Sequence, residues 1–229
     1  MSVSKDTVKK AFTATIPVMT GYLVLAIGFG ILLKTKGYGV GWSFAMSGFI
    51  YAGSMQYLTI DLLGQGASLA ATALTTLMVN ARHLFYGISM VERYRNTGKQ
   101  KPYLIFALTD ETYSLVCSEE AIDRIKEPKA YYFLVSLFNQ CYWVAGSVIG
   151  SLLGNIIPFN VEGIDFALTA LFVTIFVEQW ITTKNHKPAL IGVLSSVVCL
   201  VLLGADSFLI PSMIVIMILL LMQRQKLQE

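Results

Sequence analysis

Long apolar stretches, separated by short polar ones, limit more than any other feature what this sequence can fold into. A helix needs about 20 apolar residues to cross the roughly 30 Å core of a bilayer, and most of the stretches approach that length. Hydrophobic residues make up 55% of the 229 and charged residues 14%, against about 25% charged in soluble domains. One soluble core cannot bury this excess, which excludes an ordinary soluble enzyme, a disordered chain and a nucleic-acid binder. The stretches are Ala11–Leu33, Gly41–Leu63, Ser68–Val91, Tyr103–Ser118, Ala130–Ile157, Ile164–Thr183, Pro188–Leu203 and Ser207–Met222.

These stretches predict an all-α, polytopic helical membrane protein embedded in the lipid bilayer, with about six to eight membrane segments, some broken or re-entrant. The polar linkers are short, so we expect residues 1–229 to form a single integral membrane domain. The N-terminus carries Lys5, Lys9 and Lys10, as a signal peptide would. However, the apolar stretch after them is longer than the hydrophobic region of a signal peptide, and no cleavage site follows it. We therefore expect it to remain as a membrane segment.

Two stretches differ from plain spans. Tyr103–Ser118 is short and holds Asp110 and Glu111 side by side, which is costly against lipid. Ala11–Leu33 is long enough to span, but it contains small and helix-breaking residues, which favour a broken or closely packed helix. These residues are Pro17, Gly21, Gly28 and Gly30.

The placement of lysine and arginine indicates a topology, because these residues favour cytoplasmic loops. If every stretch crosses the membrane, the cations divide between the two sides. If Ala11–Leu33 and Tyr103–Ser118 instead dip into the membrane and return, all of the 17 cations except Arg82 lie on the inner side. The second arrangement fits the rule better and places both termini in the cytoplasm. A protein in which every stretch spans is the alternative.

Short tripeptides recur in the two halves of the chain in the same order. Ala-Gly-Ser, Leu-Leu-Gly and Ala-Leu-Thr begin at residues 52, 62 and 73, and again at residues 145, 152 and 167. The pattern predicts a weak internal repeat over residues 11–92 and 103–184. Duplicated halves around a central site are common in secondary transporters.

Charged and polar side chains inside the apolar stretches are candidate site residues, because placing charges in a membrane costs free energy. The densest group is Asn80, Arg82 and His83. On a helix Asn80 and His83 share a face, Arg82 offers a forked donor to a carboxylate, and His83 can titrate near neutral pH. The group is a substrate or proton site, or an arginine–acid pair that only joins two helices. The two interpretations are compatible.

Acidic residues form two further candidate groups. Asp110 and Glu111 together suit a cation, a proton or a substrate ammonium, unless Thr109 or Asp110 merely caps a helix. Glu178 has a threonine four residues away on each side, which gives a polar stripe on one helix face. That stripe faces a transport pathway, or Glu178 pairs with a cation near the inner surface.

Motifs of catalysis and cofactor binding are missing from the sequence. It contains no H-E-x-x-H, no G-x-S-x-G and no P-loop. With two histidines, and three cysteines that lack metal or disulfide spacing, we expect no metal site and packed free thiols. Gly28-x-Gly30 lies in an apolar stretch without a βαβ pattern, so it is no nucleotide fingerprint. We expect a protein that is not an enzyme and holds no cofactor.

A series of short motifs extends along nearly the whole chain. They are Ile16-Pro17 with Gly21, Gly28-Phe29-Gly30, Tyr51-Ala52-Gly53-Ser54-Met55-Gln56, Asn80-Ala81-Arg82-His83-Leu84-Phe85-Tyr86, Thr109-Asp110-Glu111-Thr112 and Asp165-Phe166-Ala167-Leu168-Thr169-Ala170-Leu171-Phe172. In kind and order they resemble the AzlC family. The resemblance implies the large subunit of a two-component exporter of branched-chain amino acids in the plasma membrane, which works with a small AzlD-type membrane subunit. Motif positions carried over to the site are Gln56, Asn80, Arg82, His83, Asp110 and Glu111.

The chemistry of an amino acid suggests how these residues would act. We expect export of leucine, isoleucine or valine, driven by the proton gradient. Arg82 or a helix N-terminus suits the carboxylate, and Asp110 or Glu111 suits the ammonium or a proton. Gly53 and Ser54 let backbones approach closely and leave room for a branched side chain. The alternatives are an intramembrane enzyme that uses the same acids, or a transport or assembly subunit for a different small substrate.

Overall fold

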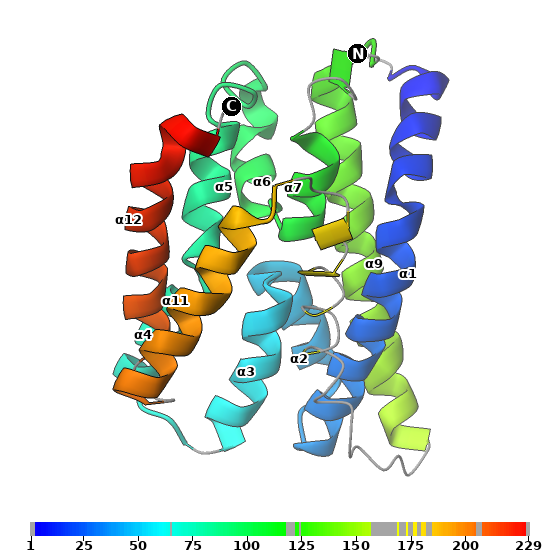
Figure 1. Ribbon diagram of the computed structural model, residues 1–229. Coiled ribbons are helices and arrows are strands. Elements are labelled where there is room, and N and C mark those ends of the chain that lie inside the picture. Colours follow the sequence, from blue (N-terminus) through cyan, green and yellow to red (C-terminus); the bar gives the residue numbers. More distant parts are fainter. Residues whose placement is uncertain are drawn as a thin grey trace. The chain divides into compact units, whose positions relative to one another are not determined.

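The computed structural model describes residues 3–64, 66–117, 122–123, 125–156, 169, 173, 176–177, 180–181, 185–204 and 208–227. The secondary structure of this part of the chain is helical, which confirms the predicted all-α class. The chain divides into two compact units, Met1–Leu168 and Thr169–Glu229 (Figure 1). The expected single domain and the expected number of membrane segments stay predictions.

The first unit contains helices of very different lengths. In chain order they are α1 (Lys5–Thr35), α2 (Val40–Ala45), the π turn η1 (Met46–Ile50), α3 (Gly53–Gly64), α4 (Leu69–Asn80), α5 (Arg82–Met90), the 3-10 turn η2 (Gly98–Gln100), α6 (Lys101–Phe106), α7 (Asp110–Val116) and α9 (Pro128–Ile156). By length and composition, α1 and α9 are the two helices of the described residues that could cross a membrane.

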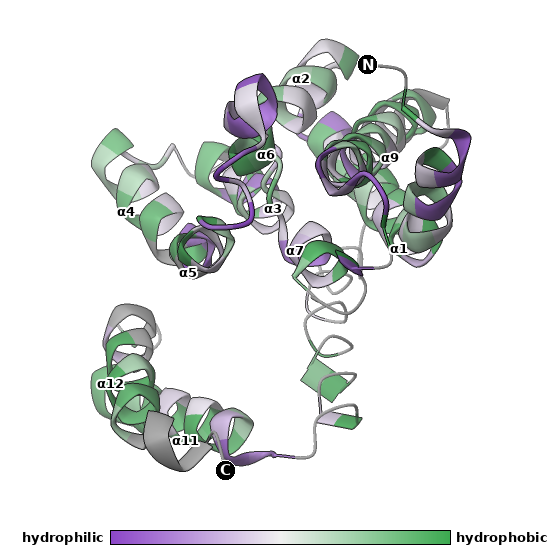
Figure 2. Cartoon of the chain, turned by 90° about the horizontal axis from the view of Figure 1, so that it is seen from above, coloured by the Kyte–Doolittle hydropathy of each residue, from purple (hydrophilic) through white to green (hydrophobic). Residues whose placement is uncertain are grey.

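Helices α1 and α9 lie side by side and run parallel (Figure 1). At one end the backbone N–H of Ser4 donates to Glu127 Oε2 at 3.0 Å, just before each helix begins. At the other end Gly154 lies against the side chain of Lys34. These two helices lie along one side of the unit, and α2, α3, α6 and α7 contact them (Figure 2).

Pro17 lies inside α1 without interrupting it, so the predicted break at this position is wrong. The proline removes one backbone hydrogen bond, while packing against α9 and a Ser4 cap on Thr7 N support the rest of the helix. With 31 residues, α1 is about 46 Å long. Lys5 and Lys34 therefore lie at opposite ends of α1, and the predicted dip and return of the first stretch is wrong as well.

Small residues allow α1 and α9 to approach closely. A Cβ on Gly30 would collide with the backbone of α9, and one on Gly150 would collide with the backbone of α1. A Cβ on Gly146 would stand 2.7 Å from the Cβ of an alanine on α1. The predicted close packing thus holds at Gly30. Gly21 is exposed, with nothing within 4 Å of a Cβ, and Gly28 is partly exposed.

The stretch predicted as a plain span at residues 41–63 is instead a helical hairpin, the first hairpin, made of α2, η1 and α3. The first arm of the hairpin runs along α9 toward the start of that helix. Ser43 Oγ donates to Ser147 O of α9, and farther along the arm Gly48 O accepts from Gln140 Nε2. At Tyr51 the backbone is left-handed (φ 47°, ψ 47°), and α3 runs back along α1. Figure 1 shows α2 and α3 both reaching the end of the unit where α1 ends.

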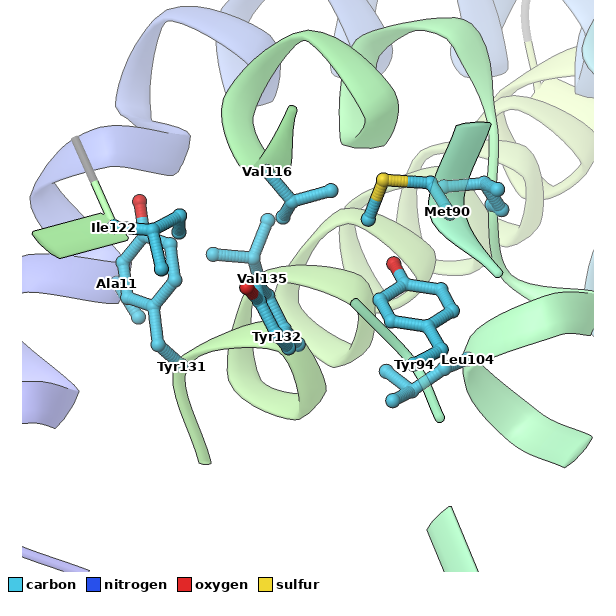
Figure 3. Close-up of a cluster of buried hydrophobic side chains, with 10 residues drawn as sticks. Ala11, Met90, Tyr94, Leu104, Val116, Ile122, Tyr131, Tyr132 and Val135 are labelled. Atoms are coloured by element: carbon cyan, nitrogen blue, oxygen red, sulfur yellow. The ribbon is translucent and has the colours of Figure 1, made fainter. Parts of the chain in front are cut away.

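A second hairpin, made of α6 and α7, enters from the opposite end. The Arg93 guanidinium donates to Val116 O at 3.4 Å, so the end of α7 returns to the turn that precedes α6. The same end holds a cluster of buried side chains from α1, α5, α6, α7 and α9 (Figure 3). This geometry agrees with the predicted dip and return of residues 103–118. The cluster comprises Ala11, Met90, Tyr94, Leu104, Leu108, Val116, Ile122, Tyr131, Tyr132 and Val135.

The second unit contains α11 (Lys187–Leu203) and α12 (Leu209–Leu227), which pack against each other. Both are strongly hydrophobic along most of their length (Figure 2). Glu178 and its two threonines lie outside the described residues, as does most of the Asp165–Phe172 motif. The repeat over residues 11–92 and 103–184 stays a prediction.

Candidate functional site

The tips of the two hairpins meet beside the middle of α1 and α9. The tip of the first hairpin is residues 48–53, and that of the second is residues 107–110. The rings of Tyr51 and Phe106 lie 6.2 Å apart between their centroids. Tyr22 of α1 and Trp143 of α9 pack edge to face beside them, at 5.2 Å. Three helices begin here, namely α3, α5 and α7.

An ion pair joins the second hairpin to the start of α5. Arg82 Nη1 lies 2.6 Å from Asp110 Oδ2, with the two side chains 28% and 23% exposed. Arg82 Nη2 donates to Ser54 Oγ at 2.6 Å. The other carboxylate oxygen of Asp110 is buried and has no hydrogen-bond partner among the described residues. The predicted pairing of Arg82 with an acid is therefore present, and it includes Ser54 at the start of α3.

Glu111 contacts a different group of side chains. The Tyr22 hydroxyl donates to Glu111 Oε2 at 2.6 Å and lies 2.8 Å from Thr109 Oγ1. Thr109 caps α7 by accepting from Thr112 N, so the capping alternative applies to Thr109. The Asn139 amide of α9 donates to Thr112 Oγ1 at 3.0 Å and fixes the helix start. Although adjacent in sequence, the two acids thus have separate partners.

Gln56 belongs to a buried polar network and not to the ion pair. Trp143 Nε1 donates to Gln56 Oε1 at 2.9 Å, and Gln56 Nε2 donates to Ser47 Oγ at 3.2 Å. Ser47 in turn donates to Ser147 Oγ at 2.7 Å. A Cβ on Gly53 would stand 2.9 Å from the side-chain ring of Trp143, so the close neighbour of this glycine is a side chain and not a backbone. The network holds the first hairpin against α9.

Asn80 and His83 flank the interruption between α4 and α5. The His83 ring nitrogen Nδ1 lies 3.1 Å from Asn80 O, and the ring packs edge to face with Tyr86 at 5.8 Å. Tyr86 stacks on Tyr113 at 4.8 Å and its phenol faces Asp110. Within the described ranges, no group of three or more histidines, cysteines or acids could hold a metal ion. Asn80 and His83 therefore border the ion pair without joining it.

Several residues of the site were not identified from the sequence. Tyrosine, tryptophan and asparagine in apolar stretches are usually packing residues, so their roles here gave no distinct pattern. The spacing of glycines at residues 146, 150 and 154 is a recognisable signal of helix packing in membranes. The residues concerned are Tyr22, Ser47, Tyr51, Thr112, Asn139, Trp143 and Ser147.

The profile of a protein family described as "AzlC protein" matches residues 17–157, a segment that holds both hairpins and the ion pair. The chain belongs to the AzlC family. It is 42% identical to the "Branched-chain amino acid transport protein AzlC" of Bacillus subtilis (strain 168) over 221 residues, which are 96% of this chain and 87% of that protein.

Other AzlC relatives carry names that refer to membranes. An "Uncharacterized membrane protein" of Helicobacter pylori (strain 26695) is 40% identical over 220 residues, 96% of each chain. The "Inner membrane protein YgaZ" of Escherichia coli (strain K12) is 26% identical over 191 residues, 80% of this chain and 78% of that protein. No solved structure matches the chain. Family and relatives agree with a transport protein of the membrane.

Proposed function

We propose that this AzlC-family chain binds and exports branched-chain amino acids across the plasma membrane, driven by the proton gradient and together with a small AzlD-type membrane subunit. The observation that carries the proposal is the Arg82–Asp110 ion pair at the point where two opposed hairpins meet. A relative named as a branched-chain amino acid transport protein supports the substrate class.

The ion pair matches the two charges of an amino acid. The Arg82 guanidinium can donate two parallel hydrogen bonds to a carboxylate. The first turn of α3 lies beside it at Ser54, and a helix N-terminus also suits a carboxylate. Asp110 has one oxygen on Arg82 and one buried oxygen without a partner in the described part of the chain, and it suits an ammonium. The incoming amino acid would replace the ion pair between Arg82 and Asp110 with two others, one from its carboxylate to Arg82 and one from its ammonium to Asp110. No charge would then be left unpaired in the membrane.

Aromatic rings supply apolar walls for the side chain of the substrate. Tyr86 and Tyr113 stack beside Asp110, and Tyr51 and Phe106 close the other side where the hairpin tips meet. A leucine, isoleucine or valine side chain gains free energy by leaving water for such a surface. A strongly polar side chain would lose more hydration free energy there than an apolar one.

The two hairpins enter the unit from opposite ends. This arrangement suits alternating access, in which a central site opens to one side of the membrane at a time. Transporters commonly place discontinuous helices at a central site, with half-helix N-termini directed at anionic substrate groups. Movement of the first hairpin would open the site toward the end of α1, and movement of the second would open it toward the start of α1. Each hairpin would then act as the gate on its own side.

The cations indicate which end is cytoplasmic. One end of the first unit holds the starts of α1, α6 and α9, and hydrophilic residues gather at the starts of α1 and α6 (Figure 2). The far end holds Lys34 and Lys36. The positive-inside rule favours the first end, and with it the N-terminus, as cytoplasmic. A cytoplasmic C-terminus remains an expectation from the loop charges. The cations of the first end are Lys5, Lys9, Lys10, Arg93, Arg95, Lys99, Lys101, Lys126 and Lys129.

Intracellular leucine tests the proposal. Cells fed a leucine-containing dipeptide should accumulate less leucine when they express this chain with its small partner than when they express neither. Equal accumulation would overturn the substrate assignment. An assembly role for Arg82 predicts that Arg82→Lys lowers the amount of protein in the membrane, whereas a transport role predicts normal abundance and lost export.

A further inference from the structure

Glu111 is a mostly buried acid that the Arg82–Asp110 pair does not use. It lies in the first turn of α7 and accepts a hydrogen bond from Tyr22 at 2.6 Å. Within the described residues it forms no ion pair, whereas Asp110 beside it is paired with Arg82. The two acids therefore differ in how their negative charge is balanced.

A buried carboxylate without a cation is costly, and binding a proton removes the cost. The titratable side chains that face Glu111 are phenols and one acid, namely Tyr22 from α1, Tyr51 from the first hairpin, Tyr86 from α5 and the neighbouring Asp110. From α9 the Asn139 amide reaches this group through a hydrogen bond to Thr112. None of these side chains carries a positive charge, and Arg82 is paired with Asp110.

The hydroxyl of Tyr51 completes the geometry. Tyr51 is 3% exposed, and its hydroxyl lies near the hydroxyls of Tyr22 and Thr109, without a hydrogen bond of good geometry to a described residue. Tyr22 in turn donates to Glu111. A protonated carboxyl gains a donor that a carboxylate lacks, and an unpartnered phenol oxygen can accept it. Through Tyr22, the buried Tyr51 hydroxyl is therefore positioned to respond to a proton on Glu111.

The same residues connect the two hairpins. Tyr51 forms the left-handed turn at the tip of the first hairpin, Thr109 lies at the tip of the second, and Glu111 follows that tip in the first turn of α7. We propose that Glu111 is the proton-binding residue that couples export to the proton gradient, and that Tyr22 and Tyr51 transmit its protonation to both hairpin tips. This assignment rests on the export function proposed above and names the group through which the driving ion acts.

The proton balance of a cycle is simple. Glu111 takes one proton from the outer side after the amino acid has left, and becomes a neutral carboxyl. The hairpins then change which side is open, and Glu111 releases the same proton to the cytoplasm. One proton enters as one amino acid leaves, and the Arg82–Asp110 pair binds the next substrate.

Two flux measurements in one preparation test the assignment. Membrane vesicles that contain the full chain and its small partner are assayed for exchange of labelled leucine at equal pH, and for leucine flux driven by a pH gradient. For Glu111→Gln we expect exchange to continue, with little dependence on pH. We expect the gradient-driven flux to fall to the level measured without a gradient. Glu92→Gln, in an exposed turn, is the matched control and should leave both fluxes unchanged.

A second variant keeps the test decisive if Glu111→Gln does not accumulate in the membrane. Tyr51→Phe removes the acceptor without changing charge, so the protonated form loses stabilisation and the pH profile of gradient-driven flux should shift toward acid. An unchanged profile would contradict the assignment. So would full gradient-driven flux in Glu111→Gln, or flux that follows a sodium gradient instead of a proton gradient. Failure of the wild type to exchange leucine would overturn the export function itself, and with it this assignment.

Discussion

Gly150 offers a sharp test of how the two long helices pack. A Cβ at this position would collide with the carbonyl oxygen of Ile27 and stand 2.8 Å from the Ile27 Cα. All of these atoms belong to the backbone of α1, so no side chain can rotate out of the way. Gly150→Ala must therefore push the helices apart. Gly21→Ala, on the exposed side of α1, meets nothing within 4 Å and is the matched control.

The expected size of the effect follows from two opposing contributions. Overpacking of a rigid contact costs about 1–3 kcal/mol, and we take the upper value because the clash is with backbone. Replacing glycine by alanine inside a helix returns about 1 kcal/mol. Gly150→Ala should then lose about 2 kcal/mol of folding free energy, and Gly21→Ala should gain about 1 kcal/mol. For a chain of this size, a loss of about 2 kcal/mol lowers the melting temperature by about 4–8 °C.

Heating series on detergent-solubilised protein measure this directly, with the monodisperse fraction followed by size-exclusion chromatography. Gly146→Ala should destabilise less than Gly150→Ala, because the clash is with a side-chain Cβ at 2.7 Å. Gly154→Ala should be milder still, since its nearest neighbour, the Lys34 Cβ, stands 3.1 Å away. If Gly150→Ala melts at or above the temperature of Gly21→Ala, the close packing of α1 and α9 is refuted.

Three further outcomes are expected. Arg82→Lys should keep normal abundance on membrane blots but lose export. The lysine ammonium lacks the planar pair of donors with which arginine contacts Asp110 and Ser54 at the same time. Pro17→Ala should raise the melting temperature and leave leucine flux unchanged, because the helix is already continuous there; loss of flux would show that the proline has a functional role. Hydrogen bonds from Ser4 and Thr7 lower the pKa of Glu127, so its stabilising contribution is complete above the unfolded pKa of about 4.3 and is lost as pH falls through the lower folded pKa. The difference in melting temperature between the wild type and Glu127→Gln should therefore shrink below about pH 4, and a constant difference would contradict this role.

Parts of the fold and site were predictable because they depend on composition and local pattern. Long apolar stretches imply helices, and a lone arginine within such a stretch needs an acid nearby. The break before Asp110 was predictable as well, because two adjacent acids do not fit a plain span. Which of the two acids pairs with Arg82 was not, since neighbouring residues on a helix point about 100° apart and only the tertiary arrangement selects between them.

Other features depend on conformations that leave little trace in a sequence. The first hairpin turns at Tyr51, a residue type that rarely adopts a left-handed backbone, so residues 41–63 had the pattern of one continuous span. At Pro17 the sequence predicted a break where the helix is continuous. Proline usually interrupts a helix, but packing against α9 supports α1 on both sides of this residue. Glu111 and Tyr22 meet only because the second hairpin returns toward the middle of α1.

Binding of leucine to the purified chain tests the central claim, that Arg82 and Asp110 hold the two charges of a branched-chain amino acid. Labelled leucine should be displaced by isoleucine and valine. It should not be displaced by 3-methylbutylamine, which lacks the carboxylate, or by 4-methylpentanoate, which lacks the ammonium. Arg82→Lys and Asp110→Asn should each lose binding, while Glu111→Gln should keep it. Displacement by either single-charge analogue at the concentration effective for isoleucine would contradict a site built on this ion pair.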